Sequence, residues 1–260
     1  MSLLISGDLR LAAVFDPEIT SYIAAVEAAD GQALEPATKA AYINFILGCK
    51  ADGIWTAIKA SCIMAGARTL DGALVPLVGT APTNNNFVSG DYNRKTGLVG
   101  DGSTKYLDSN RNNDADPQNS QHLAVYVTVL PTGLANRFTG DGTGSTGRTT
   151  IGHQNMPAPL NFRLRTDTLY TSSLGNISAN RLIGVSRSNS SNFTERSNNQ
   201  SATVTAASET PTTGAIEVFR GTTNPTNARL AFYSIGEYLD LALLDARVTD
   251  LINAFAAAIP

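Results

Sequence analysis

The sequence predicts a mainly β protein, an antiparallel β-sandwich that carries an N-terminal helical segment and a C-terminal closing helix. Three observations predict this fold class. From residue 75 onward, short apolar runs recur between clusters of Gly, Ser, Thr and Asn, a pattern typical of sandwiches. The first 74 residues instead show helical periodicity, and the last strand-like run passes directly into an amphipathic helix. No repeat of fixed period is visible, which argues against solenoids and propellers.

The N-terminal part predicts two helices. Asp16-Pro17-Glu18 is a strong helix start, with a capping acceptor, a proline at the first position and an acid near the positive end of the helix dipole. This helix is expected to end at Asp30-Gly31, and the second to run from about Pro36 to Gly48. One apolar stripe lies along the first helix: Ile19, Tyr22, Ile23 and Val26.

An apolar segment follows these helices, DGIWTAIKASCIMAGA at residues 52–67, and carries the single tryptophan, Trp55. Helices and segment together are too small to fold alone, so we expect them to pack on the sandwich or on a neighbouring subunit. Residues 1–15 are expected to form a short strand or an arm that docks on another subunit. The chain is therefore divided into 1–74, an N-terminal arm and helical docking segment, and 75–260, the sandwich with its closing helix at 240–258. The side chains expected to dock are Ile19, Tyr22, Ile23, Val26 and Trp55.

The second part predicts eight short strands, of which HLAVYVTVL, residues 122–130, alternates most clearly. The polar stretch 166–213 could be disordered instead of forming strands, because it is poor in aromatic residues and rich in Ser, Asn and Thr. Apolar residues such as Leu182 and Phe193 return there at strand-like intervals and favour strands. The predicted strands are 97–107, 122–130, 148–152, 161–169, 181–186, 202–207, 215–220 and 229–235.

The C-terminal end predicts a buried strand and then a helix. Residues 229–235 are apolar on both faces, and Gly236 ends the run. Asp240 is placed to cap the helix that follows. The apolar positions of that helix recur at helical spacing: Leu241, Leu244, Val248, Leu251, Ile252 and Phe255.

The string YSIGEYL at residues 233–239, which joins this strand to this helix, carries a family resemblance. It resembles the C-terminal end of the concanavalin A-like (laminin-G-like) jelly rolls of tailed-bacteriophage structural proteins, as do strings near residues 79–84 and GLVGDGSTKYL at 97–107. The resemblance implies a concanavalin A-like jelly roll in a non-enzymatic virion structural protein, displayed on the particle surface as a head decoration or fibre or as a tail adsorption component. Its implied location is the virion, after synthesis in the host cytoplasm.

The implied partners are other virion proteins and further copies of the chain, a trimer being one symmetric arrangement. Net charge is −3, and the Lys and Arg residues are scattered, so neither nucleic acid nor a membrane surface is expected as a partner. No apolar run is long enough to span a bilayer, and the first residues lack the features of a secretory signal. Cys49 and Cys62 are expected to be buried free thiols on helix-like sequence.

Two loops carry candidate ligand-binding patterns. Residues 140–147, GDGTGSTG, hold a formal dinucleotide fingerprint, but a strand-like run follows where a helix is required, so a hairpin loop is expected. Asn112, Asp114 and Asp116 alternate and could begin a calcium site. An EF-hand would need Gly and Glu where Pro117 and Leu123 stand, and an Asx-rich surface turn is the competing interpretation. We therefore expect no cofactor, with Ca²⁺ as the alternative.

Catalysis is not expected. Glycan hydrolysis needs two carboxylates about 5 to 10 Å apart, yet Glu195, Glu209 and Glu217 are isolated in the sequence. His122 and His153 stand outside the known catalytic motifs; His122 is expected at a strand edge and His153 in a loop.

A second function class remains open, a module that binds host-surface glycan as a receptor. Tyr92, Tyr106 and Tyr170 lie near turns or strand ends, as does Tyr238, and exposed rings there could stack on sugars. Packing in the core or at its rim is the alternative fate of such tyrosines. A glycan hydrolase is a less favoured third interpretation.

Overall fold

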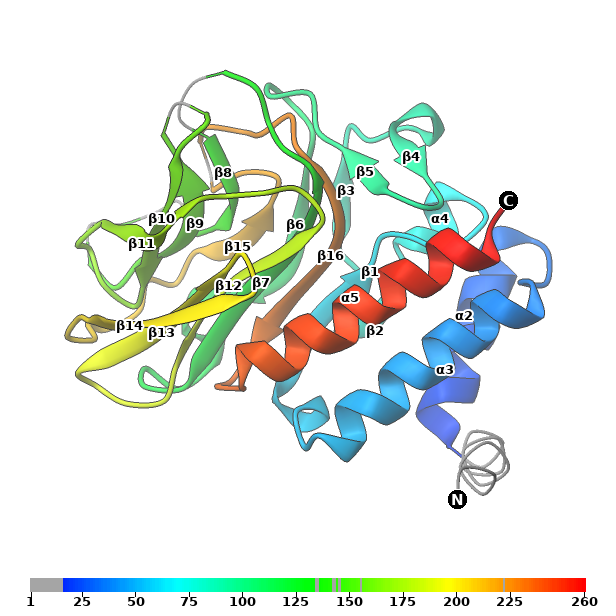
Figure 1. Ribbon diagram of the computed structural model, residues 1–260, viewed down its shortest axis with the longest axis horizontal. Coiled ribbons are helices and arrows are strands. Elements are labelled where there is room, and N and C mark those ends of the chain that lie inside the picture. The colour runs from blue at the N-terminus through cyan, green and yellow to red at the C-terminus, as the bar shows by residue number, and fades with distance from the viewer. Residues whose placement is uncertain (1–15, 134–135, 142–143, 145, 155, 222) are drawn as a thin grey trace.

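The chain folds as a sandwich of two antiparallel sheets with helices stacked on one side (Figure 1). The predicted fold class, a mainly β antiparallel sandwich with an N-terminal helical segment and a C-terminal helix, is confirmed. The computed structural model describes residues 16–133, 136–141, 144, 146–154, 156–221 and 223–260. The arm expected at residues 1–15 lies outside the described residues.

Sheet A has the strand order β14-β13-β12-β7-β16-β1-β2, with β5 on β16 and β4 on β5. Its long central strands, β7 and β16, are buried on both faces, as continuous apolar runs require. The strands of sheet A are β1 (Ile58–Ile63), β2 (Pro76–Val78), β4 (Tyr92–Asn93), β5 (Gly97–Val99), β7 (Gln121–Val129), β12 (Arg181–Arg187), β13 (Asn192–Ser197), β14 (Gln200–Thr205) and β16 (Arg229–Gly236).

Sheet B has the order β11-β10-β9-β8-β15-β6-β3. Strands β8 and β9 pair antiparallel, so the glycine-rich residues 140–147 join two paired strands, as the hairpin prediction requires. The strands of sheet B are β3 (Thr83–Asn85), β6 (Tyr106–Asn112), β8 (Asn136–Gly140), β9 (Thr149–His153), β10 (Pro159–Leu164), β11 (Tyr170–Asn176) and β15 (Ala215–Val218).

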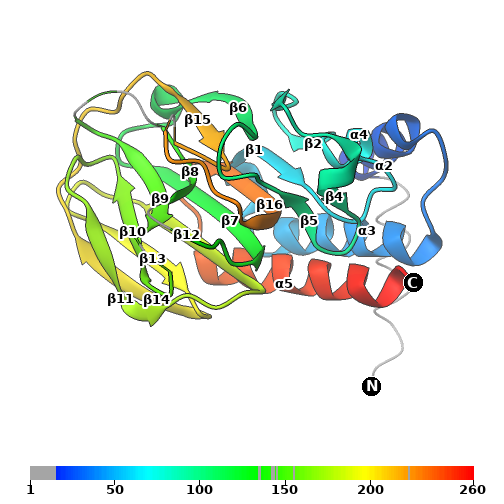
Figure 2. The same ribbon diagram turned by 90° about the horizontal axis from the view of Figure 1, so that it is seen from above.

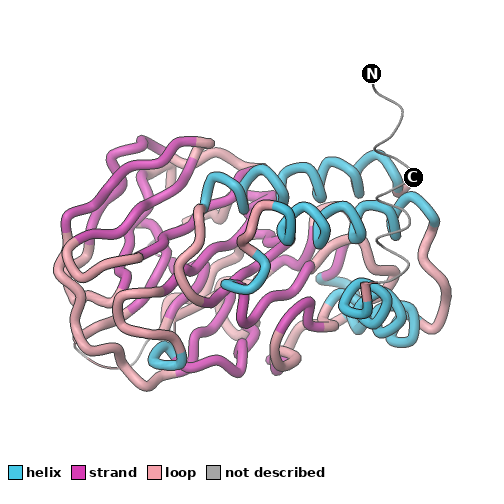
Figure 3. The backbone as a smooth tube through the Cα atoms, turned by 90° about the horizontal axis from the view of Figure 1, so that it is seen from below, coloured by secondary structure: helices cyan, strands magenta, loops and turns pink. Residues whose placement is uncertain are grey.

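Helices α3 and α5 lie side by side along one side of the molecule (Figure 3). The side chain of Asp16 accepts hydrogen bonds from two backbone N–H groups of α2, and that of Asp240 accepts one from α5, as the sequence predicts. The helical elements are α2 (Pro17–Asp30), α3 (Pro36–Ala51), α4 (Leu70–Ala73) and α5 (Leu241–Ala258), with short 3₁₀ turns η1 (Trp55–Ala57), η2 (Ser89–Asp91) and η3 (Asn113–Ala115).

Helix α3 continues past Gly48, where the sequence predicted its end. The glycine has a packing role instead, because a Cβ there would lie 2.8 Å from Cδ of Arg247 on α5. Arg247 passes α3 at this point and donates two hydrogen bonds, 2.7 and 2.8 Å long, to the carboxylate of Asp52. A close approach between helices therefore explains this glycine better than a helix terminus does.

Two hydrophobic cores stabilise the fold, one between the helices and sheet A and one between the two sheets. The side chains expected to dock on a particle belong to the first core. Ile19, Tyr22, Val26 and Trp55 are buried there, and Ile23 packs against them. These side chains are covered by the chain's own helices and sheet, so they offer no accessible docking surface.

The apolar segment at residues 52–67 forms η1 and β1. Strand β1 lies between β16 and β2, so a strand from before residue 74 is built into sheet A. Cys62 lies in β1 and Cys49 in α3, and both are buried free thiols; the helix-like interpretation was wrong for Cys62. A short apolar run has no decisive period, and pairing with β16 makes this one a strand.

Seven of the eight strand predictions match one strand each, within a few residues. The predicted strand 97–107 is instead split between β5 and β6, because Asp101 accepts hydrogen bonds from the backbone N–H groups of Ser103, Thr104 and Lys105 and turns the chain. The polar stretch 166–213 holds β11 to β14, so disorder was the wrong alternative there. Among the described residues, no helix has the length and apolarity that crossing a bilayer requires.

Candidate functional site

The candidate site is the outer face of sheet B, meaning the face turned away from sheet A. Phe138, Ile151 and Phe162 point into the core between the sheets, so their strand neighbours Arg137 and Arg163 point outward. Among the described residues of the core under the helices, none belongs to sheet B. Figure 2 shows α3 and α5 on the other side of sheet A, so the described helices leave this face uncovered.

Three arginines gather on this face, Arg137 on β8, Arg148 just before β9 and Arg163 on β10; we call them the arginine cluster. Burial and repulsion from Arg148 lower the pKa of Arg137. Burial and repulsion from Arg148 and Arg137 lower the pKa of Arg163. The strand register places Arg137 beside Gly152 and Arg163 beside Thr150, so these two arginines flank β9 on the same face of the sheet.

Strand β9 makes room for this cluster at Gly152. A Cβ there would lie 2.6 Å from Nη1 and 2.8 Å from Cδ of Arg137, so the arginine lies across the strand over the glycine. Beyond it, the Oδ1 atom of Asn161 accepts a hydrogen bond of 3.2 Å from the hydroxyl of Thr171 on β11. Polar side chains therefore continue from the cluster to the exposed edge of the sheet.

The other half of the face carries acids. Asp108 on β6 and Glu217 on β15 are direct cross-strand partners. Glu217 accepts hydrogen bonds of 2.7 and 2.8 Å from the guanidinium of Arg220. That guanidinium also lies 3.2 Å from the ring centroid of Tyr106, so it covers one face of a ring that we expected to stack on sugar.

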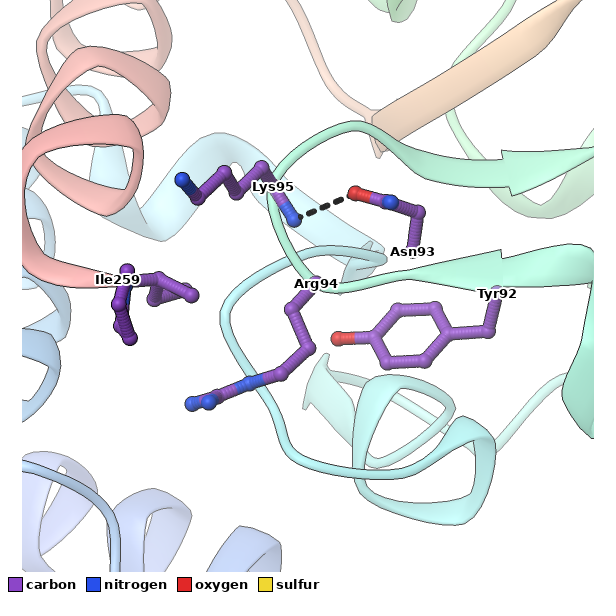
Figure 4. A pocket seen from close by; sticks show the side chains of 6 residues that line it. Tyr92, Asn93, Arg94, Lys95 and Ile259 are labelled. Carbon is purple, nitrogen blue, oxygen red and sulfur yellow. Dashed lines mark hydrogen bonds between the residues drawn. The ribbon is translucent and has the colours of Figure 1, made fainter.

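Tyr92 lies elsewhere, in a surface pocket of ≈ 470 Å³ between β4 and the end of the chain (Figure 4). Its hydroxyl donates a hydrogen bond of 2.7 Å to the Ala67 carbonyl. Beside it, Arg94 donates to both carboxylate oxygens of Glu35 at 3.1 and 2.8 Å. The Tyr92 hydroxyl and the Arg94 guanidinium are therefore engaged within the protein. The lining residues are Tyr92, Asn93, Arg94, Lys95, Ile259 and Pro260.

Tyr170 packs against the core between the sheets, with its ring edge-on to Phe193 at 5.8 Å between centroids. The three tyrosines thus lie in three separate places. The structure does not bring them onto one surface, whereas it does bring the arginine cluster together. Sequence reasoning missed Arg137 and Arg163, although alternation in NFRL, residues 161–164, could have placed Arg163 opposite the core-facing Phe162 and Leu164.

The loop expected to hold calcium has another role. Asp116 is buried and forms an ion pair with Arg111, whereas Asp114 is exposed in η3 and Asn112 ends β6. Within the described ranges, no three His, Cys, Asp or Glu side chains are grouped so that they could hold a metal ion. The neighbouring Asn113 is instead part of a buried polar network.

This network lies between the sheets at one end of the sandwich. The side-chain amide of Asn113 donates to Oδ2 of Asp141 at 3.1 Å, and the backbone N–H of Thr149 donates to Oδ1 at 2.7 Å. Gln121 joins Asn113 and Thr149 through hydrogen bonds of 3.0 and 2.9 Å. Burial raises the pKa of Asp141 to about 7 despite these donors. Nothing in the glycine-rich sequence around Asp141 indicated its burial.

Both histidines are buried. His122 lies in the central strand β7, not at a sheet edge, and its ring nitrogens contact the Glu237 carbonyl at 2.6 Å and the Ser234 hydroxyl at 2.7 Å. Burial lowers the pKa of His122 to about 4. His153, which we expected in a loop, lies in β9 with its ring against Phe138. Neither histidine reaches the outer face of sheet B.

No family model matches this chain, and no curated protein is significantly similar to it in sequence. Solved structures share its fold. The botulinum neurotoxin serotype D binding domain is 11% identical with a TM-score of 0.50, and the match covers 75% of this chain and 51% of that one. The Ruminococcus gnavus IT-sialidase CBM40 bound to α2,3-sialyllactose is 12% identical with a TM-score of 0.38, and the match covers 55% of this chain and 83% of that one. Trypanosoma rangeli sialidase is 8% identical with a TM-score of 0.45, and the match covers 78% of this chain and 33% of that one.

At these identities the likeness concerns the fold alone. The chain spans about half of the neurotoxin structure and about a third of the Trypanosoma sialidase. Function has to be argued from the chain's own surface.

Proposed function

We propose that this chain is a non-catalytic carbohydrate-binding module whose ligand lies on the outer face of sheet B. The observation that carries the proposal is the layering of the fold. Helices α3 and α5 cover sheet A, and the described helices leave the opposite face of the sandwich to polar side chains on strands. A face of that kind is available to a ligand without rearrangement of the core.

The chemistry of the face suits sugar hydroxyl groups. The half-buried Arg163 and the exposed Thr171 offer hydrogen-bonding groups on two adjacent strands, and the buried Asn161 holds the Thr171 hydroxyl in place. Tyr106 is already stacked by Arg220, so hydrogen bonding is expected to dominate over ring stacking. This is the glycan-binding alternative drawn from the sequence, with the arginine cluster and β11 in place of the three tyrosines as the contact residues.

The test is a glycan array probed with the wild-type chain and with a variant whose face is blocked. Thr171→Trp places a bulky ring on exposed β11 and should reduce binding of any captured glycan by about tenfold or more, since it occludes the face. Thr203→Trp is the matched control, an exposed threonine on β14 of sheet A, and should bind as the wild type does. A flat array profile, or equal binding by both variants, would exclude this face as a glycan site.

Hydrolysis is a second candidate, favoured by one observation, the cross-strand pair Asp108 and Glu217. A glycosidase needs one of its two acids protonated as a proton donor. Both carboxylate oxygens of Glu217 already accept hydrogen bonds from Arg220, so we prefer binding without cleavage. Chain shortening of a bound polysaccharide on prolonged incubation, abolished by Glu217→Gln, would reverse this preference.

We also propose a setting, the surface of a tailed-phage virion, as a head decoration, fibre or tail adsorption component. Its support is the resemblance carried by residues 233–239, which form the end of β16 and the start of the connection to α5. Immunogold labelling and mass spectrometry of purified virions test it. Labelling of heads indicates a decoration or fibre, labelling of tail tips indicates adsorption, and absence from particles contradicts the setting.

A further inference from the structure

The arginine cluster is unusual in its charge balance. Arg148 forms an ion pair with Asp167. Arg137 and Arg163 form no ion pair with any described residue; their hydrogen bonds go to the backbone carbonyls of Asn136, at 3.5 Å, and Asp167, at 2.9 Å. The cluster thus holds three cations and one anion on a half-buried surface.

Such an arrangement is unfavourable in the free protein. Partial burial removes water from Arg137 and Arg163, and mutual repulsion adds to that cost; both effects lower the pKa of each side chain. An anion bound at this part of the face would supply the missing negative charge and replace the lost water. Each guanidinium presents a planar fork of donors that matches carboxylate or sulfate oxygens.

The fold holds these arginines in place without carboxylate partners for them. Gly152 leaves the space that the Arg137 side chain occupies. The backbone carbonyl of Asp167 accepts a hydrogen bond from Nε of Arg163. The carboxylate of Glu209 accepts hydrogen bonds from the backbone N–H groups of Asp167, at 2.8 Å, and Gly147, at 2.6 Å. Glu209 thereby ties the loop before β9 to the turn after β10, on which the cluster depends.

We propose that Arg137 and Arg163 bind the carboxylate or sulfate group of an acidic sugar residue, so that the ligand is an anionic glycan. This inference rests on the proposed function and narrows it. Neutral glycans would reach the same face but would leave both guanidinium groups without a counterion.

The experiment measures the affinity of the full chain for matched acidic and neutral polysaccharides. The probes are polysialic acid and hyaluronan, each beside its carboxyl-reduced form, with heparin as a sulfated probe and single-stranded DNA as a polyanion that is not a glycan. The variants are Arg137→Gln and Arg163→Gln. The matched control is Arg181→Gln on β12 of sheet A, an arginine of similar exposure that forms no ion pair with a described residue.

We expect at least one acidic glycan to bind better than its carboxyl-reduced form or than single-stranded DNA. Each cluster variant should weaken that binding by about 10-fold to 100-fold, while Arg181→Gln should leave it unchanged. Preference for hyaluronan or polysialic acid identifies a carboxylate ligand, and preference for heparin identifies a sulfate ligand.

Three results would overturn the inference. Equal binding of acidic and carboxyl-reduced forms that is insensitive to Arg137→Gln removes the anion site but leaves the carbohydrate-binding function standing. Binding would reflect general surface charge if Arg181→Gln lost as much affinity as the cluster variants. The same conclusion would follow if DNA bound as tightly as glycan. Absence of binding to every probe, acidic or neutral, contradicts the proposed function itself.

Discussion

At the scale of single residues, two buried titratable groups respond to pH in opposite senses. The pKa of Asp141 is raised to about 7 by burial, above its value in the unfolded chain, so the folded state binds its proton more tightly. The stabilising effect of that proton is present at acidic pH and is lost as pH rises toward 7. The pKa of His122 is lowered to about 4, so its contribution to stability is present above about pH 6.5 and is lost on acidification.

Replacing Asp141 should therefore change how stability depends on pH. In the wild type, this carboxyl should lower the unfolding free energy by a few kcal/mol between pH 4.5 and 7.5. In Asp141→Asn that decline should disappear. Urea unfolding of variant and wild type at both pH values measures the difference and cancels the opposing contribution of His122. The control is Asp114→Asn, an exposed acid on η3, and an unchanged slope in Asp141→Asn would contradict the assignment.

At the scale of elements, α5 is the piece that connects the helical layer to the sandwich. Its apolar stripe packs on sheet A and on α3, and its Phe255 ring lies edge-on to Tyr42 at 5.0 Å between centroids. Because β1, from the N-terminal part, also pairs with β16, the helical layer and sheet A share their stabilising contacts. We expect them to unfold together.

Truncating Phe255 tests this shared stability. Phe255→Ala should lower the unfolding free energy by about 3–5 kcal/mol, since the ring is fully buried and the cavity can close only in part. Tryptophan fluorescence reports on Trp55 beneath the helices and circular dichroism reports on the sheets, and both should shift to the same lower denaturant midpoint. Leu243→Ala, 37% exposed on the same helix, should change stability little. Separate transitions for the two signals would show that the layers unfold independently.

At the scale of the whole molecule, the fold has a covered side and an uncovered side. The helices lie on sheet A, and the proposed glycan site lies on the far face of sheet B (Figure 2). The side on which the protein is attached to a support should therefore decide whether it binds glycan.

Site-directed immobilisation tests this orientation. Cys49 and Cys62 are buried, so a surface cysteine should react selectively with a maleimide support. Ala256→Cys, on the exposed side of α5, should give a surface that retains glycan binding. Thr171→Cys, on β11, should give a surface that no longer binds glycan, as measured by surface plasmon resonance. Equal binding by both surfaces would contradict a site on sheet B.

The sequence by itself determined the local features of this protein. Asp16, Asp240 and the strand pattern at residues 122–130 could be interpreted correctly because caps and strand alternation depend on near neighbours along the chain. Only the tertiary structure decided which faces are covered. Arg137 and Arg163 come to lie on one face, on the strands either side of β9, because strand pairing joins segments that the linear sequence keeps apart. Asp141 becomes buried through contacts with Asn113 and Thr149 for the same reason. The same pairing made β1 a strand and placed Ile19 and Trp55 inside the protein's own core.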